Sequence, residues 1–368
     1  MICMKSLSFV VQNYLRLTRS QSYIKIMEGV LNPRQAGRYI TENCNDVFIE
    51  DKGVKSLAKL LYDKVKTGSL DVTMWRQHEL NPQTMDENAV NWVFVSAVLN
   101  FSFWSANETE KYMVKYKGKE HTGYWALCAA MNRALDEGFQ LTDPTFYATV
   151  ELDTLKKIFR SDSQFDIPLL DEREQVLHEA GKVLLERFQG RFVNVIKQAD
   201  NNAQLLLKLV VNNFTSFQDV AEYKGKQVGL YKRAQILIGD IWGSCEGRGL
   251  GEFHDFDTIT MFADYRIPQA LVYFKVLKYS DHLWNKLRQG YLFKSGEQLE
   301  VEIRGVSLWA CELIRDEILH LLETDSNKRE SKTDVCAILV DHYLWDIRRE
   351  VADKMTDIPF HRCRGIFY

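Results

Sequence analysis

Apolar residues recur at intervals of three and four along much of this chain, and this spacing restricts its fold more than any other feature. Such spacing places apolar side chains on one face of a helix, and that face must pack against a core. It predicts helices over residues 54–65, 89–98, 176–187 and 311–322. Only 6 prolines and 20 glycines interrupt the 368 residues, which favours long helices over many short strands. We therefore expect a mainly α fold.

Residues 112–124 depart from the helical pattern. Tyr112, Val114 and Tyr116 alternate with Met113 and Lys115, and a Lys-Gly-Lys turn sequence follows. Alternation with a period of two is typical of a strand, so this segment predicts a small β-hairpin. Stretches rich in polar or breaker residues predict loops at 161–168, 222–229, 243–251 and 324–333.

The length favours two domains. We place the boundary near residue 150, which gives an N-terminal helical region with the hairpin at 28–150 and a C-terminal helical region at 151–368. Helical domains of this size can interleave. Residues 1–27 contain basic residues but no acidic residue, a composition compatible with mitochondrial targeting. We favour a simple extension and a cytoplasmic protein.

The run between Glu87 and Glu108 lacks charged residues and is long enough to raise the question of a membrane span. Asparagine and serine residues interrupt it, and its apolar residues keep helical spacing. A helix packed inside a soluble protein explains this pattern better, so we predict no transmembrane segment.

The charge balance bears on the partners of the protein. With 47 basic and 50 acidic residues, the net charge of −3 provides no broad positive field for polymeric nucleic acid. A small substrate and a monomeric protein are expected. The seven cysteines include no CxxC pair, which argues against a metal site and favours a reducing compartment. The HExxH, GxSxG, GxGxxG and phosphate-loop motifs are absent, and we expect no cofactor.

Two segments contain residues that could support chemistry. Residues 232–242 form a helix by spacing, with Lys232 opposite the apolar stripe and Asp240 on its flank. Taken alone, both are typical of a solvated surface. Asp264 is followed by Tyr265 and Arg266, and Pro268 comes shortly after. Pro268 therefore predicts that Asp264 lies near the first turn of a helix, in a site or in a structural salt bridge.

The end of the chain adds two further groups. An acid, Asp346, follows Trp345 directly. His361, Arg362 and Arg364 form a basic cluster that could bind a phosphate or could lie in a solvated tail.

Short motifs throughout the chain resemble the queuosine 5′-phosphate N-glycosylase family, which acts in queuosine salvage. The resemblance extends from about residue 31 to residue 368. It rests on residues 31–34, 91–95, 99–104, 127–130, 232–235, 259–266, 301–305, 343–346 and 359–362.

This resemblance implies a function that spacing alone does not provide. Members of the family release the base queuine from the nucleotide during recycling of modified transfer RNA, and their fold is similar to that of helical DNA glycosylases. The resemblance implies Asp264 and Lys232 as catalytic residues. A base-repair glycosylase of related fold and a non-catalytic nucleotide-binding protein are the alternatives.

The remaining candidates receive roles from the chemistry of that reaction. Asp264 would stabilise positive charge on the sugar. Lys232 or Arg266 would take up charge on the departing base, or Lys232 would anchor the ribose or its phosphate. We expect stacking on the base from aromatic side chains, binding of the cyclopentene arm by two acids, and phosphate binding by the C-terminal cluster. These residues are Phe103, Trp104, Phe262, Tyr265 and Trp345; Asp240 and Asp346; and His361, Arg362 and Arg364.

Overall fold

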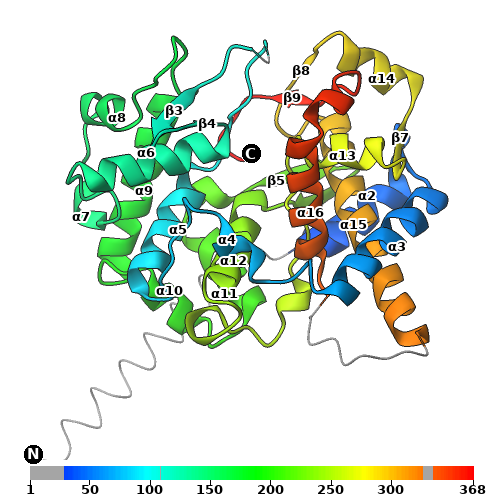
Figure 1. The fold of residues 1–368 in the computed structure, drawn as a ribbon, viewed down its shortest axis with the longest axis horizontal. Coiled ribbons are helices and arrows are strands. Elements are labelled where there is room, and N and C mark those ends of the chain that lie inside the picture. The colour runs from blue at the N-terminus through cyan, green and yellow to red at the C-terminus, as the bar shows by residue number, and fades with distance from the viewer. Residues whose placement is uncertain (1–28, 108, 326–334) are drawn as a thin grey trace, which may run out of the picture.

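The computed structural model describes residues 29–107, 109–325 and 335–368. Most of them lie in helices (Figure 1), which confirms the mainly α prediction. The four segments with the clearest helical spacing form α3 (Asp51–Thr67), α5 (Glu87–Leu99), α9 (Leu170–Arg187) and α15 (Gln298–Thr324). The other helices are α2 (Pro33–Asn43), α4 (Met74–Gln77), α6 (Tyr124–Asp136), α7 (Pro144–Tyr147), α8 (Leu152–Ile158), α10 (Val193–Gln198), α11 (Ala203–Asn213), α12 (Lys232–Ser244), α13 (Ile267–Tyr273), α14 (Asp281–Arg288) and α16 (Ala337–Glu350).

The strands are short and form small sheets. The predicted hairpin is confirmed, with β3 (Met113–Tyr116) antiparallel to β4 (Lys119–Thr122). A second sheet has the order β1-β6-β5, in which β1 (Val30–Leu31) runs parallel to β6 (Lys226–Gly229). The remaining strands are β5 (Val220–Tyr223), which is antiparallel to β6; β2 (Val47–Ile49), which pairs with β7 (Leu277–Tyr279); and β8 (Leu292–Phe293), which pairs with β9 (Arg362–Cys363).

The prediction of a loop over residues 222–229 is wrong, because this segment contains most of the β5–β6 hairpin. The polar pair Lys224 and Gly225 forms only its two-residue turn, and both residues have positive φ angles of 45° and 80°. Two-residue turns of this kind match the twist of antiparallel strands. The same residue types that suggested a loop therefore connect two paired strands.

Segments far apart in the sequence pack together. Helices α2 and α3 lie against α15, and α5 lies against α12. In Figure 1, α16 stands between the group around α5 and the group around α13 and α15. Both pairs join regions on opposite sides of the predicted domain boundary near residue 150, which stays a prediction. The predicted extension, residues 1–27, lies outside the described residues.

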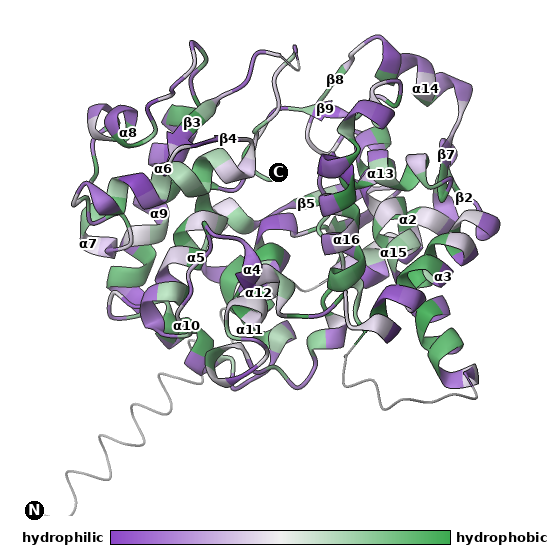
Figure 2. Ribbon diagram, viewed as in Figure 1, coloured by the Kyte–Doolittle hydropathy of each residue, from purple (hydrophilic) through white to green (hydrophobic). Residues whose placement is uncertain are grey.

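Helix α12 is central to the packing. Figure 2 shows mainly hydrophobic residues on α12 and a largely hydrophilic surface on the outer helix α14. All residues of α12 are buried, and most residues of α5 are buried as well. None of the helices in the described residues is both long enough and apolar enough to span a membrane.

Small residues allow α2 and α15 to approach closely. A Cβ atom on Gly37 of α2 would lie 3.0 Å from the Cβ of Leu308, and one on Gly305 of α15 would overlap Ile40. Helix α2 begins with a capping box, in which Asn32 and Gln35 exchange side-chain and backbone hydrogen bonds, and Pro33 occupies its first position. These contacts explain the motifs at residues 31–34 and 301–305.

Arg304 of α15 connects the backbone segments that position the candidate site. Its guanidinium forms ion pairs with Asp219, at 2.5 Å, and with Glu300, at 3.1 Å. The Nε of Arg304 donates to the carbonyl oxygen of Ala263, and Asp219 accepts a hydrogen bond from the backbone N–H of Lys232. One buried cation thus fixes both the residue before Asp264 and the first residue of α12.

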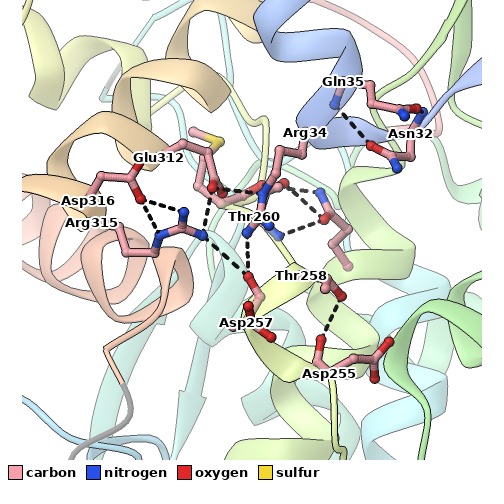
Figure 3. A network of polar contacts seen from close by, with 12 residues as sticks. Asn32, Arg34, Gln35, Asp255, Asp257, Thr258, Thr260, Glu312, Arg315 and Asp316 are labelled. Atoms are coloured by element: carbon pink, nitrogen blue, oxygen red, sulfur yellow. Dashed lines mark hydrogen bonds and ion pairs between the residues drawn. The ribbon is translucent and has the colours of Figure 1, made fainter. Parts of the chain in front are cut away.

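A second polar network joins α2 and α15 to the segment that leads to Asp264 (Figure 3). Arg34 pairs with Glu312 at 2.9 Å, and Arg315 reaches the same carboxylate at 2.8 Å. The carbonyl oxygen of Asp257 accepts hydrogen bonds from both arginines. The irregular backbone before Asp264 is therefore held by side chains from two helices.

The last residues of the chain pack against the end of α5. The phenol of Tyr368 donates to Glu300, at 2.7 Å, and its ring centroid lies 4.1 Å from the guanidinium carbon of Arg304. The backbone N–H of Ser102 donates to the carbonyl of Tyr368, and the indole N–H of Trp104 donates to the carbonyl of Cys363. The C-terminal segment thereby becomes part of the same core.

We predict that Arg304→Met lowers the free energy of unfolding by about 3–5 kcal/mol, because it leaves two carboxylates buried without their cation. Urea unfolding measures the change. Lys59→Ala is the control, since its ion pair with Asp63 is exposed on α3 and should contribute less than about 1 kcal/mol. Equal effects of the two substitutions would contradict the role given to Arg304.

Candidate active site

A cavity of about 580 Å³ opens between α12, α16 and the segment before α13. Its wall combines aromatic, acidic and basic side chains from distant parts of the sequence. The residues used below are Trp75, His78, Asn81, Asn100, Phe103, Trp104, Tyr124, Trp125, Lys232, Ile236, Asp240, Phe262, Asp264, Tyr265, Arg266, Asp341, Trp345, Asp346, Arg348, Arg349 and Tyr368.

One face of α12 forms part of the cavity wall. Lys232, Ile236 and Asp240 follow each other at intervals of four and all line the cavity, as expected for residues on one side of a helix. Lys232 and Asp240 are eight residues apart, which corresponds to about 12 Å along the helix axis. The cavity therefore has a basic end and an acidic end along this helix.

The first turn of α12 is fixed from three sides. Arg233 is buried and donates to backbone carbonyls at the end of α5 and at Ser216. The side-chain carbonyl of Gln235 accepts hydrogen bonds from both the backbone N–H and the hydroxyl of Thr260. Of the motif at residues 232–235, Lys232 therefore faces the cavity, and the neighbouring polar residues hold the helix in place.

Lys232 is buried, with an exposed fraction of 4%, so the solvated position suggested by spacing alone is wrong. Its Nζ lies 3.3 Å from both the carbonyl oxygen and the side-chain oxygen of Asn100. Burial lowers the pKa of Lys232 to about 8, although the negative charges of Asp264 and Asp341 oppose the shift. The amine is therefore still mostly protonated at neutral pH, with its proton easier to release than usual.

Asp264 lies directly before α13, as Pro268 predicted. Its Oδ1 accepts hydrogen bonds from the backbone N–H groups of Arg266, at 2.7 Å, and Ile267, at 2.9 Å. These donors belong to the open first turn of the helix. The other oxygen, Oδ2, has no hydrogen-bond partner among the residues that the structure describes. The backbone thus fixes one oxygen of this cavity-lining carboxylate and leaves the second for a ligand.

Asp341 of α16 is a second acid at this end of the cavity. It is buried and accepts a hydrogen bond from the backbone N–H of Phe262, at 3.0 Å. Burial raises its pKa well above the ordinary value, and the negative charge of Asp264 adds to the effect. Two neighbouring carboxyl groups in such a site favour different protonation states. Asp341 thus favours the acid form.

Asp240 marks the opposite end of the cavity. Its Oδ1 accepts a hydrogen bond from the indole N–H of Trp75, at 2.7 Å. Burial raises the pKa of Asp240 to about 7, against a weaker lowering by Trp75 and Lys232. Asp346 of α16 also lines the cavity, and burial raises its pKa to about 6. Both acids are in surroundings that would favour a cationic ligand.

Aromatic side chains form the walls between the two ends. The imidazole of His78 stacks on Trp125 with ring centroids 3.3 Å apart and an angle of 4° between the rings. Trp345 meets the edges of Trp125, at 5.6 Å, and Tyr124, at 6.4 Å. Flat walls of this kind suit a planar heterocycle.

Three guanidinium groups line the cavity near α16. Arg266 and Arg348 both donate to the side-chain oxygen of Gln269, at 3.2 and 2.9 Å. Gln269 is itself buried and donates to backbone carbonyls at Met355 and Ile358. Arg349 adds a third positive charge. This group makes the α16 side of the cavity suitable for an anion.

This geometry agrees with the comparisons with known proteins. The family model described as queuosine salvage protein matches residues 80–368.

The chain belongs to the queuosine salvage protein family.

Curated relatives in this family are named queuosine 5′-phosphate N-glycosylase/hydrolase. The Bos taurus protein is 50% identical over 343 residues, which cover 93% of this chain and all of the relative. The Nematostella vectensis protein is 41% identical, with coverage of 92% and 99%. The Sphaerobacter thermophilus protein is 36% identical, with coverage of 90% and 96%. The resemblance read from the sequence motifs is confirmed.

Most candidate residues of this queuosine salvage family member line one cavity. The structure brings together the two proposed catalytic residues, the aromatic candidates, the two acids of the opposite end and one arginine. They are Asp264, Lys232, Phe262, Tyr265, Arg266, Asp240, Phe103, Trp104, Trp345 and Asp346.

The C-terminal basic cluster does not line this cavity. His361 is buried beside Tyr368, and burial lowers its pKa to about 3, so its ring is neutral at pH 7. The guanidinium of Arg362 lies 5.8 Å from the ring of Phe360. Arg364 stacks on Trp104, at 3.7 Å, and lines a smaller cavity next to the first. Phosphate binding by these three residues stays a prediction.

Sequence reasoning missed several cavity residues, among them Trp75, Asp341, Arg348 and Arg349. Those on α16 carry a signal in hindsight, because Asp341, Trp345 and Arg348 are spaced by four and three and share a helix face. Trp75 has no such signal, since α4 contains only four residues.

We predict that Asp240→Asn raises the melting temperature at pH 8 and leaves it nearly unchanged at pH 4. The folded protein disfavours ionisation of Asp240, so the cost of its charge appears as pH rises from about 4 to about 7 and is full above that. The amide removes this cost. Thermal unfolding of both proteins at several pH values measures the effect, with Asp63→Asn on the exposed face of α3 as the control. A gain independent of pH would contradict this explanation.

Proposed function

We propose that this chain hydrolyses the N-glycosidic bond of queuosine 5′-monophosphate and releases queuine and ribose 5-phosphate, so that queuine can return to transfer RNA. The observation that carries the proposal is the placement of Asp264, whose Oδ1 is held by backbone donors while Oδ2 is left for a ligand. Buried Lys232 lies at the same end of the cavity. The curated relatives carry a name that states this activity.

Breaking the bond between C1′ and the base builds positive charge on the sugar, as in glycoside hydrolysis. In the proposed reaction, Asp264 stabilises this charge electrostatically and accepts a proton from the attacking water. Its hydroxyl oxygen bonds to C1′ as the bond to the base breaks. Because backbone N–H groups fix Asp264 before the substrate arrives, little reorganisation is needed during the reaction.

The electron pair of the broken bond leaves with the base. Queuine is a 7-deazaguanine and lacks the N7 atom that guanine offers for protonation, so its charge must be taken up by a donor elsewhere on the ring. We assign this role to Lys232. Its pKa of about 8 makes it both protonated at neutral pH and a better acid than a solvated lysine.

The opposite end of the cavity suits the substituent that distinguishes queuine from guanine. Its cationic amine would be attracted by Asp240 and Asp346, which lie in surroundings without a lysine or arginine ion pair among the described residues. The aromatic walls would stack on the base, an interaction of about 1–3 kcal/mol per base in stacking platforms. Ordinary guanine nucleotides lack the amine and would leave these acids unpaired.

The 5′-phosphate is assigned to Arg266 and Arg348, which Gln269 holds side by side. Arg266 is two residues from Asp264, which places a cation near the sugar. The C-terminal arginine Arg364 is the competing assignment.

The remaining features of the proposal concern partners and setting. A cavity of about 580 Å³ suits a mononucleotide, and a net charge of −3 does not favour polymeric nucleic acid. We further propose a monomeric, cytoplasmic enzyme that uses water as its only co-reactant, with an architecture like that of helical DNA glycosylases.

We expect Asp264→Asn to abolish queuine release while substrate binding is retained, because the amide oxygen can still accept the hydrogen bonds from Arg266 and Ile267. Chromatography of free queuine after incubation with queuosine 5′-monophosphate measures turnover, and calorimetry measures binding. Asp63→Asn controls for loss of a carboxylate elsewhere. Turnover within tenfold of the unmodified protein would remove Asp264 from the mechanism.

The phosphate assignment predicts that Arg348→Gln raises KM for the nucleotide by about tenfold or more, the magnitude of one charge-assisted hydrogen bond. KM for the dephosphorylated nucleoside should change by less than about twofold, and added salt should weaken only nucleotide binding. Arg364→Ala tests the competing assignment in the same assay. If only Arg364→Ala separates the two substrates, the phosphate binds near the C-terminal cluster.

A further inference from the structure

Asn81 is a buried cavity residue with an unusual hydrogen-bonding state. Its exposed fraction is 4%, and it lines the cavity near Asp240 and Trp75. The side-chain nitrogen donates to the carbonyl oxygen of Trp75, at 2.7 Å. The side-chain oxygen Oδ1 has no donor within hydrogen-bonding distance among the residues that the structure describes.

The orientation of this amide is determined by its neighbour. A backbone carbonyl such as that of Trp75 can only accept, so the nitrogen of Asn81 must face it and the oxygen must face away. A buried acceptor without a partner costs about 1–3 kcal/mol. The fold therefore spends stability to present an acceptor in the cavity.

The backbone around Asn81 is rigidly held. Its N–H donates to the carbonyl of His78, and its carbonyl accepts from the side chain of Gln83, at 2.8 Å. Trp75 is fixed in turn, because its indole donates to Asp240 and a Cβ on Gly243 would lie only 2.8 Å from its own Cβ. The amide oxygen is thus placed by α4 and by the end of α12.

The location of Asn81 indicates which part of a ligand it contacts. Asp240, which shares Trp75 with Asn81, lies about 12 Å along α12 from Lys232. A base whose glycosidic bond lies at Lys232 and Asp264 reaches this end only through a substituent. A carboxylate suits a cationic amine, whereas a neutral amide oxygen suits a hydroxyl donor.

We propose that Asn81 determines specificity by accepting a hydrogen bond from a hydroxyl of the cyclopentenediol ring, while Asp240 binds the amine that precedes it. This inference rests on the proposed function, whose substrate carries both groups. Trp75 and the stacked pair of His78 and Trp125 form the flat surfaces around this ring. Loss of one buried hydrogen-bond partner discriminates strongly between substrates.

The test compares two substrates. Queuosine 5′-monophosphate has the diol ring, and 7-aminomethyl-7-deazaguanosine 5′-monophosphate keeps the base, the amine and the phosphate but lacks it. Asn81→Ala should lower kcat/KM for the first by about tenfold to a hundredfold and for the second by less than about twofold. Asn212→Ala is the matched control, because the side-chain oxygen of Asn212 is also buried without a partner but lies outside the cavity lining. It should affect neither substrate.

An equal loss on both substrates would give Asn81 a structural role and overturn the proposal. If Asn81→Ala does not fold, as judged by circular dichroism, the unmodified protein decides the matter. It should prefer the diol substrate by about tenfold or more, and rates within about threefold would also overturn the proposal. Release of neither base by the unmodified protein would instead contradict the proposed glycosidase activity itself.

Discussion

The buried guanidinium of Arg304 lies at the junction of the elements on which the site depends. It pairs with Asp219 and Glu300, and it donates to the carbonyl that precedes Asp264. Through Asp219 it also fixes the start of α12, where Lys232 enters the cavity. An ion pair this deeply buried provides little net stability, but its hydrogen bonds fix several backbone segments relative to one another. Its importance is therefore geometric, because a basic and an acidic residue from separate elements must meet in one cavity.

The cavity collects charged groups that the rest of the core excludes. Asp240 and Asp341 are buried acids with raised pKa values, and Lys232 is a buried base with a lowered one. Each costs stability in the absence of a ligand, and such clusters mark functional sites more often than structural ones. Their separation along α12 gives the cavity a reactive end and an opposite end that we propose selects the substrate. The unpartnered oxygen of Asn81 belongs to the second end.

Local sequence predicted local structure well where one pattern dominated. Helical spacing located α5 and α15, and alternation located the β3–β4 hairpin. It failed where the same residues suit two structures, as at Lys224 and Gly225, which form a tight turn between strands. It also failed at Lys232, because a helix face opposite the apolar stripe usually meets water, whereas here it meets an internal cavity. Nothing in the sequence near Asn81 revealed that its amide oxygen would lack a partner.

By itself, the sequence determined the helices, the first hairpin and, through its motifs, the family and the chemistry to expect. These properties depend on residues close together in the chain, where backbone geometry relates spacing to position directly. Only the tertiary structure decided that Trp75, Lys232, Asp264 and Asp341 share one cavity while His361 lies outside its lining. Contacts of that kind depend on how distant segments pack, and packing is set by the shape and burial of the whole core.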